Sequence, residues 1–154
     1  MARVVITGVG TATPAGLTNQ DFWRALTEKR NCIAAVSRFD VSPFKCRRAA
    51  ELKNLDGNTF PGRKSLWKIS RSIAFAFSAA TSALQDARLD ATPGKHPEAG
   101  VVFGTTLGGL TPLLELDRQA LTEGPRAADP MLFPSAGASA PGCQISVTLG
   151  MQAF

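Results

Sequence analysis

The chain has 154 residues, of which 44% are hydrophobic and 19% are charged, and its formal net charge is +5. This length and composition predict one globular domain with a core and exclude an intrinsically disordered chain. No apolar run approaches the roughly 20 residues that cross a bilayer, and no secretory signal follows Arg3, so we expect a cytoplasmic protein that does not enter a membrane.

The cysteines and the single histidine exclude most metal-site patterns. Cys32, Cys46 and Cys143 have no C-x-x-C spacing, and His96 is the only histidine, so we expect reduced thiols and no bound metal. The moderate positive charge suits an anionic partner. Nucleic acid is not expected, because no basic motif interleaved with aromatic residues occurs in the sequence.

A β-branched run at Val4–Thr7 predicts the first strand, which leads directly into Gly8-Val9-Gly10. A dinucleotide-binding fingerprint would need a third glycine where Thr13 stands. It would also need a helix to begin within the motif, where Pro14 interrupts the chain. A dinucleotide-binding oxidoreductase therefore stays only as a weakened alternative.

The first helix is predicted at residues 18–31. Thr18 is a suitable N-cap, and Asp21 stands three residues later as its capping partner. One side of this helix is apolar and carries Phe22, Trp23 and Leu26. Residues 36–52 predict a loop followed by a short extended segment, and residues 54–62 predict a loop.

A long helix is predicted at about residues 66–89. Its apolar residues recur at helical spacing and form one stripe of Ile69, Ile73, Phe77, Ala80 and Leu84. Many of its other residues are alanine, which favours close packing against neighbouring elements.

The second half of the chain begins with a continuously apolar run at residues 100–104, which predicts a strand covered on both faces. A further helix is predicted from Thr111 as N-cap, with Pro112 at its first position, to about Gly124. The chain ends with small residues and then the alternating apolar Ile145, Val147 and Leu149. This order of strands and helices predicts an α/β fold.

Several stretches together resemble the β-ketoacyl-acyl-carrier-protein synthases, the condensing enzymes of fatty-acid and polyketide synthesis. They occur in family order at residues 3–16, 22–26, 38–40, 83–90, 101–110, 123–135 and 149–150. The resemblance implies a thiolase-like fold with layered α/β/α architecture. Residues 1–154 would be the N-terminal part of such a domain and would end before the position of the family's nucleophilic cysteine.

The family's reaction is decarboxylative Claisen condensation between a cysteine-bound acyl group and malonyl-carrier protein, without a metal or redox cofactor. The family's two histidines and its lysine also lie beyond the matched part. We therefore expect no catalytic residue in this chain and no condensing activity from the chain alone.

Cys143 has no histidine nearby in the sequence, so it is interpreted as a packing residue, as are Cys32 and Cys46. His96 is interpreted as a surface residue of a proline- and glycine-rich loop.

The resemblance also implies binding residues. Leu107 matches a residue that lines the acyl-chain tunnel, and Phe133 matches a segment that reaches across the dimer interface towards the partner's acyl pocket. Core packing is the alternative for both residues. A basic cluster of Arg63, Lys64, Lys68 and Arg71 matches the surface on which the family docks its acidic carrier protein. An ordinary solvated helix face is an equally good interpretation of this cluster.

The expected partners are an acyl carrier protein and a second ketosynthase-type chain, in a homodimer or a heterodimer. A separate C-terminal fragment is a further expected partner. The sequence departs from the family at Ser139, Cys143 and Ala153-Phe154. These departures leave open a non-catalytic subunit that resembles the chain-length factors or one half of a split protein.

Overall fold

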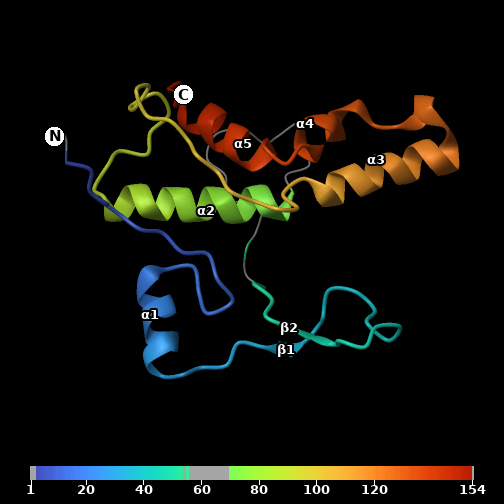
Figure 1. Cartoon of the computed structure of the whole chain (residues 1–154), viewed down its shortest axis with the longest axis horizontal. Coiled ribbons are helices and arrows are strands. Elements are labelled where there is room, and N and C mark those ends of the chain that lie inside the picture. Colours follow the sequence, from blue (N-terminus) through green and yellow to red (C-terminus); the bar gives the residue numbers. More distant parts are fainter. Residues whose placement is uncertain (1–2, 54, 56–69, 154) are drawn as a thin grey trace.

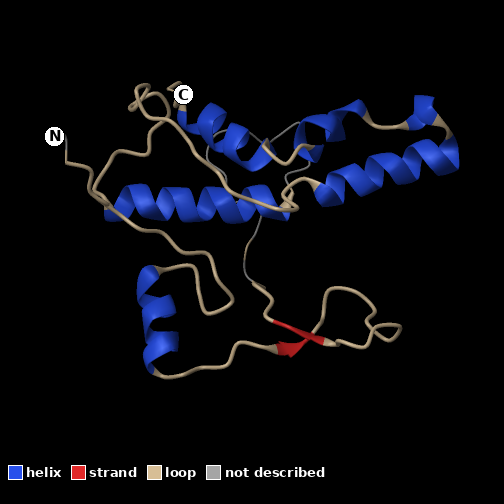
Figure 2. Cartoon of the chain, in the orientation of Figure 1, coloured by secondary structure: helices blue, strands red, loops and turns tan. Residues whose placement is uncertain are grey.

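The computed structural model describes residues 3–53, 55 and 70–153, and helices form most of its regular structure (Figures 1 and 2). In chain order the elements are α1 (Asn19–Thr27), β1 (Ala34–Ala35), β2 (Arg48–Ala49), α2 (Arg71–Asp86), α3 (Leu110–Glu123), η2 (Pro125–Ala127), η3 (Pro130–Leu132), α4 (Phe133–Ala136) and α5 (Ala140–Leu149). The predicted loop at 54–62 lies outside the described residues except for Leu55.

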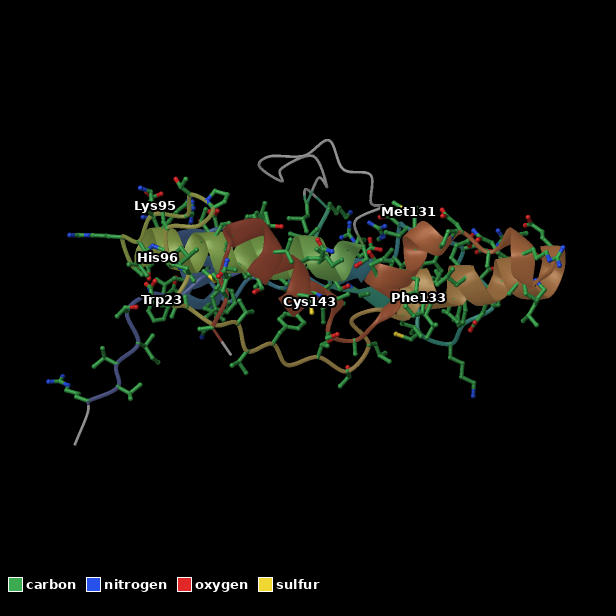
Figure 3. All side chains as sticks on the ribbon, turned by 90° about the horizontal axis from the view of Figure 1, so that it is seen from above. Trp23, Lys95, His96, Met131, Phe133 and Cys143 are labelled. Atoms are coloured by element: carbon green, nitrogen blue, oxygen red, sulfur yellow. The ribbon has the colours of Figure 1, made fainter. Side chains whose placement is uncertain are left out.

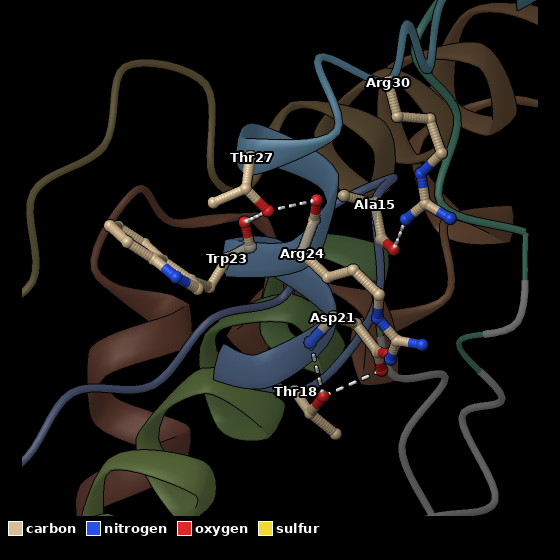
Figure 4. Close-up of polar contacts among 7 residues, drawn as sticks. All are labelled: Ala15, Thr18, Asp21, Trp23, Arg24, Thr27 and Arg30. Atoms are coloured by element: carbon tan, nitrogen blue, oxygen red, sulfur yellow. Dashed lines mark hydrogen bonds and ion pairs between the residues drawn. The ribbon is translucent and has the colours of Figure 1, made fainter.

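Helix α1 begins where the sequence predicts it and ends at Thr27, before the predicted end at residue 31. The Thr18 hydroxyl accepts a hydrogen bond from the backbone N–H of Asp21 at 3.1 Å and donates one to the Asp21 carboxylate at 2.7 Å (Figure 4). Arg24 completes the first turn with an ion pair to Asp21 at 2.5 Å. The expected apolar side is only partly realised, because Trp23 and Leu26 are exposed.

Helix α2 and helix α5 pack together and hold the core. Ser70 caps α2 by accepting a hydrogen bond from the Ile73 N–H, and Ile73 and Phe77 of the predicted stripe are buried. Phe77 packs with Ile145 and Leu149 of α5. Alanines on α2 let the two helices approach closely, so the sequence pattern and the packing agree for this element.

The alternation at the end of the sequence belongs to a helix. Ile145 and Leu149 are spaced four residues apart on α5 and both are buried, whereas Val147 between them is 79% exposed. Four-residue spacing brings two side chains to the same face of a helix, and the intervening position points away.

Helix α3 begins two residues earlier than predicted. Its N-cap is Gly109 and not Thr111, and no side chain caps it. Pro112 therefore lies in the first turn, where the missing N–H would have no partner within the helix in any case. A side chain at Gly109 would overlap the carbonyl oxygen of Ala136, so glycine permits the close contact between α3 and α4.

The two predicted core strands are not formed among the described residues, and the layered sheet does not appear there. Residues 100–104 run alongside α2 as extended chain (Figure 1), and residues 4–7 are extended chain that leads to Gly8 at the end of α2. The described sheet nevertheless consists of β1 and β2 alone, with Ala34 opposite Ala49. One isolated parallel bridge joins Gly100 to Ala153. The prediction of strands was wrong for these residues because a strand needs a hydrogen-bonded neighbour, and the described chain supplies none beside Val4–Thr7.

Candidate functional site

An open apolar groove lies over α2 between the two extended segments. Its volume is about 440 Å³, and its walls are Thr7 and Gly8 on one side and residues 100–103 on the other. Its floor consists mainly of α2 alanines, including Ala76, Ala79, Ala80 and Ala83. We call this feature the α2 groove. The sequence analysis did not identify it, although the many alanines of α2 were a signal of close packing.

Leu107 lies in a loop that leads from the second extended segment into α3. The loop is fixed where it meets α3, because the Ser72 hydroxyl donates to the carbonyl of Gly108 and the N–H of Leu110 donates to the carbonyl of Leu107 at 3.2 Å. The Leu107 side chain is nevertheless 66% exposed. Core packing, the alternative interpretation of Leu107, is therefore not realised in the described residues.

Phe133 is the first residue of α4 and is 74% exposed, whereas its neighbours Leu132 and Ser135 are buried (Figure 3). The buried neighbours anchor the short helix and leave the phenyl ring outside the core. Phe133 and Leu107 thus share one property, an apolar side chain held on an ordered backbone without a covering layer.

Arg71 is the one member of the basic cluster that lies within the described residues. Its guanidinium donates a hydrogen bond to the carbonyl of Leu52 at 2.6 Å and lies over the Phe75 ring, with 5.1 Å from Cζ to the ring centroid. Partial burial lowers the pKa of Arg71, and the nearby charge of Arg38 lowers it further. Arginine stays protonated all the same, so Arg71 links the segment after β2 to α2.

The other members of the basic cluster precede α2 in the chain. Arg71 is the first residue of α2, and Ser70 before it has an extended backbone with ψ of 153°. Arg63, Lys64 and Lys68 themselves lie outside the described residues.

The thiols and the histidine do not form a catalytic pair. Cys143 and Cys46 are exposed free cysteines, so their interpretation as packing residues was wrong, while Cys32 is partly buried. Figure 3 shows Cys143 and His96 well separated along the molecule. Nucleophilic catalysis needs the thiol and its base within hydrogen-bond reach. Within residues 3–53, 55 and 70–153, no three His, Cys, Asp or Glu side chains gather as a metal site.

His96 is not the surface residue that the sequence predicted. Its side chain is only 23% exposed, and Nδ1 lies 3.6 Å from a carboxylate oxygen of Glu98. Its Nε2 is buried and has no hydrogen-bond partner in the part of the chain that the structure describes. The loop folds back on the end of α5, where the Gly94 N–H donates to the Leu149 carbonyl at 2.9 Å, and this long-range contact has no local sequence signal.

Residues 1–154 match the family described as Beta-ketoacyl synthase, N-terminal domain. The chain belongs to the β-ketoacyl synthase family. This confirms the resemblance found in the sequence. A relative from Synechocystis sp., 3-oxoacyl-[acyl-carrier-protein] synthase 2, is 39% identical over 132 residues, which are 86% of this chain and 32% of the relative.

Two solved structures show that this β-ketoacyl synthase chain has the ketosynthase fold. The ishigamide ketosynthase/chain length factor matches with a TM-score of 0.80 and 27% identity, over 96% of this chain and 37% of the solved one. A type II PKS acyl-carrier protein in complex with its ketosynthase matches with a TM-score of 0.72 and 20% identity, over 99% and 36%. The chain thus spans about a third of the length of the relatives that it matches. No described helix of this family member is long and apolar enough to cross a bilayer.

Proposed function

We propose that residues 1–154 are the N-terminal part of a 3-oxoacyl-acyl-carrier-protein synthase-type protein with a layered, thiolase-like α/β/α domain. The observation that carries the proposal is the family match over residues 1–154, together with the 39% identical 3-oxoacyl-[acyl-carrier-protein] synthase 2. The complete protein would work in the cytoplasm as a dimer of ketosynthase-type chains.

The proposed reaction joins two acyl groups without a metal or redox cofactor. A cysteine outside residues 1–154 holds the growing acyl chain as a thioester. Malonyl-carrier protein loses carbon dioxide, and the resulting carbanion attacks the thioester carbonyl, so that a carbon–carbon bond forms and the cysteine thiolate leaves. Residues of this chain would shape the acyl pocket and the docking surface.

The chain alone should form no condensation product, because its described thiols have no histidine partner. The test is an assay with acyl- and malonyl-carrier protein, first with the chain alone. The second assay adds a polypeptide equivalent to the part of the Synechocystis relative that the match leaves out, and product is expected only there. Turnover by the chain alone that disappears in Cys143→Ala would contradict the proposal.

A non-catalytic subunit that resembles a chain-length factor is the second candidate. The observation that favours it is the likeness to the ishigamide ketosynthase/chain length factor, at 27% identity and a TM-score of 0.80. In this case the chain would still form no product after addition of the polypeptide equivalent to the unmatched part of the relative. Product would appear only after addition of a catalytic ketosynthase chain.

Leu107 and Phe133 are proposed to shape the acyl pocket. Replacing Leu107 by phenylalanine should shorten the products or the bound acyl groups, because the larger ring would take up space that the acyl chain needs in the pocket of the complete protein. The measurement is the acyl-chain length of the products that this chain forms together with the added polypeptide. The control is Leu121→Phe, since Leu121 is exposed on α3 far along the chain from the loop. An unchanged product profile in folded Leu107→Phe would contradict the proposed role.

Lys64 and Lys68, with Arg63 and Arg71, are proposed to dock the acidic carrier protein. The double variant Lys64→Glu with Lys68→Glu should slow carrier-protein association several-fold at low salt, because rim charges act mainly on the association rate. Salt should weaken the wild-type interaction, since the Debye length is about 10 Å at 0.1 M. The measurement is carrier-protein titration at two salt concentrations. The charge-matched control is Lys29→Glu with Lys95→Glu, because both lysine residues are exposed. Equal rates of carrier-protein association for wild type and for Lys64→Glu with Lys68→Glu would contradict docking.

A further inference from the structure

We infer that Ser72 is a positioning residue, whose hydroxyl holds the loop that carries Leu107 and thereby sets the length of acyl group that the complete protein accepts. Ser72 lies in the first turn of α2, next to Arg71 of the basic cluster. The inference rests on the proposed function for the acyl group. It goes further by naming a residue that acts on the acyl chain only through Leu107.

The loop at residues 105–109 is tied to α2 by a hydrogen bond. Figure 1 shows the chain before α3 passing the start of α2, and there the Ser72 hydroxyl donates to the Gly108 carbonyl. In the described parts of the chain, no other hydrogen bond joins residues 105–108 to an element outside α3. Gly108 is buried, and a buried carbonyl without a donor is costly. Without the Ser72 hydroxyl, the loop should therefore shift until this carbonyl reaches water.

The hydroxyl groups at the start of α2 form a chain of hydrogen bonds with one direction. A carbonyl oxygen only accepts, so the single hydroxyl proton of Ser72 goes to Gly108. The hydroxyl oxygens of Ser70 and Ser72 lie 2.9 Å apart, and this contact must then be a donation from Ser70. Ser70 in turn accepts from the Ile73 N–H at 3.4 Å. The N-cap of α2 and the loop are thus the two ends of one hydrogen-bond chain.

Helix α2 does not need the Ser72 hydroxyl in order to form. Ser70 supplies the N-cap, and alanine has a higher helix propensity than serine. The first turn is also fixed from outside the helix, because the Arg71 guanidinium donates to the Leu52 carbonyl at 2.6 Å. The start of α2 is therefore a firm anchor, and the contribution of the Ser72 hydroxyl is its contact with Gly108.

The same loop also contacts α4. A Cβ added at Gly109 would overlap the carbonyl oxygen of Ala136, which is the last residue of α4. Phe133 is the first residue of that helix. The loop is therefore held between the start of α2 and α4, and a shift of the loop changes the position of Leu107 relative to Phe133.

A small shift of these two side chains should matter in an acyl pocket. Leu107 is 66% exposed and Phe133 is 74% exposed, so the backbone places them and a surrounding core does not. Apolar pockets discriminate between ligands that differ by one methylene by roughly 10- to 200-fold. A loop that is no longer tied to Ser72 lets Leu107 yield to a longer chain. Loss of the hydroxyl should therefore lengthen the accepted acyl group, which is opposite to the effect expected of Leu107→Phe.

Product lengths of Ser72→Ala and Ser72→Thr test this role, with the full chain and the added polypeptide. Ser72→Ala should raise the share of products longer than the main wild-type product by about tenfold, the lower end of the discrimination for one methylene. Ser72→Thr keeps a hydroxyl and should restore the wild-type profile. The matched control is Ser82→Ala, which removes a half-buried serine hydroxyl from the second half of α2. A lower yield with an unchanged profile, or the same profile in Ser72→Thr as in Ser72→Ala, would overturn the inference.

A double variant tests whether Ser72 acts through Leu107. In Leu107→Ala, the further change Ser72→Ala should leave the product profile unaltered, because the side chain that the loop positions is already gone. Residues that act through one another give non-additive effects. Additive effects of the two substitutions on product length would overturn the inference.

Amide hydrogen exchange of the full chain tests the contact without relying on catalysis. The Leu110 amide donates to the Leu107 carbonyl, and it should exchange about fivefold or more faster in Ser72→Ala, since a released loop opens more often. Amides in the second half of α2 should keep their rates. Unchanged exchange at Leu110 would overturn the inference. Absence of product from the wild-type chain with the added polypeptide would contradict the proposed function instead, and the exchange rates would then decide separately whether Ser72 holds the loop.

Discussion

Replacing Phe77 by alanine should lower the free energy of unfolding by about 3–5 kcal/mol, the range measured for large aromatic residues removed from cores. Phe77 is 4% exposed and packs with Ile145 and Leu149 between the two central helices. Removal of the ring loses its transfer free energy and leaves a cavity that two packed helices fill only in part. Typical domains are stable by about 5–15 kcal/mol, so this one change should bring the chain close to unfolding.

Urea unfolding followed by circular dichroism measures this effect. The matched control is Phe133→Ala, which removes the same side chain from an exposed position and should change stability by less than about 0.5 kcal/mol. Equal destabilisation by the two substitutions would contradict the assignment of the core to the contact between α2 and α5.

Replacing Gly10 by alanine should destabilise the chain by about 1–3 kcal/mol, as overpacking does elsewhere. The added methyl group would overlap the carbonyl oxygen of Ala79 and lie 2.5 Å from the backbone nitrogen of Ala83. Helix backbone cannot move away as a flexible side chain can. The extended segment around Gly8 and Gly10 should therefore lift from α2 and lose the hydrogen bond from the Val9 N–H to the Asp86 carboxylate.

The control is Gly104→Ala, because a methyl group at Gly104 would meet nothing within 4 Å. Exchange of the Val9 amide should become faster in Gly10→Ala and stay unchanged in Gly104→Ala. Retention of wild-type stability and of Val9 protection in Gly10→Ala would show that the extended segment does not rest on the helix as described.

The parts of the fold that follow from local chemistry could be predicted from the sequence. The N-cap of α1 depends on Thr18 and Asp21, three residues apart, and the buried stripe of α2 depends on spacing within one helix. Helix α5 could not be predicted in this way. Its alternating Ile145, Val147 and Leu149 suit a strand pattern as well as a helix, and packing against α2 decides between them.

The two extended segments could not be assigned correctly from their β-branched residues. Pairing depends on a neighbour that is remote in sequence, and the residues described here do not include one beside Val4–Thr7.

For the candidate site, the family resemblance suggested Leu107 and Phe133, and both side chains are exposed. Arg63, Lys64 and Lys68 lie outside the described residues, so the docking role of the basic cluster stays a prediction. The partial burial of His96 accompanies a contact between its loop and the remote end of α5, through the Gly94 N–H and the Leu149 carbonyl.

The unpaired apolar run at Val4–Ile6 has a consequence for synthesis of the protein. A ribosome adds about 5–20 residues per second, so residues 7–154 take on the order of ten seconds or more to follow this run. During that interval Val4, Val5 and Ile6 stand in water and can pair with other nascent chains. A charge next to such a segment disfavours aggregation, and Arg3, directly before Val4, is placed to act as this gatekeeper while the chain is still being made.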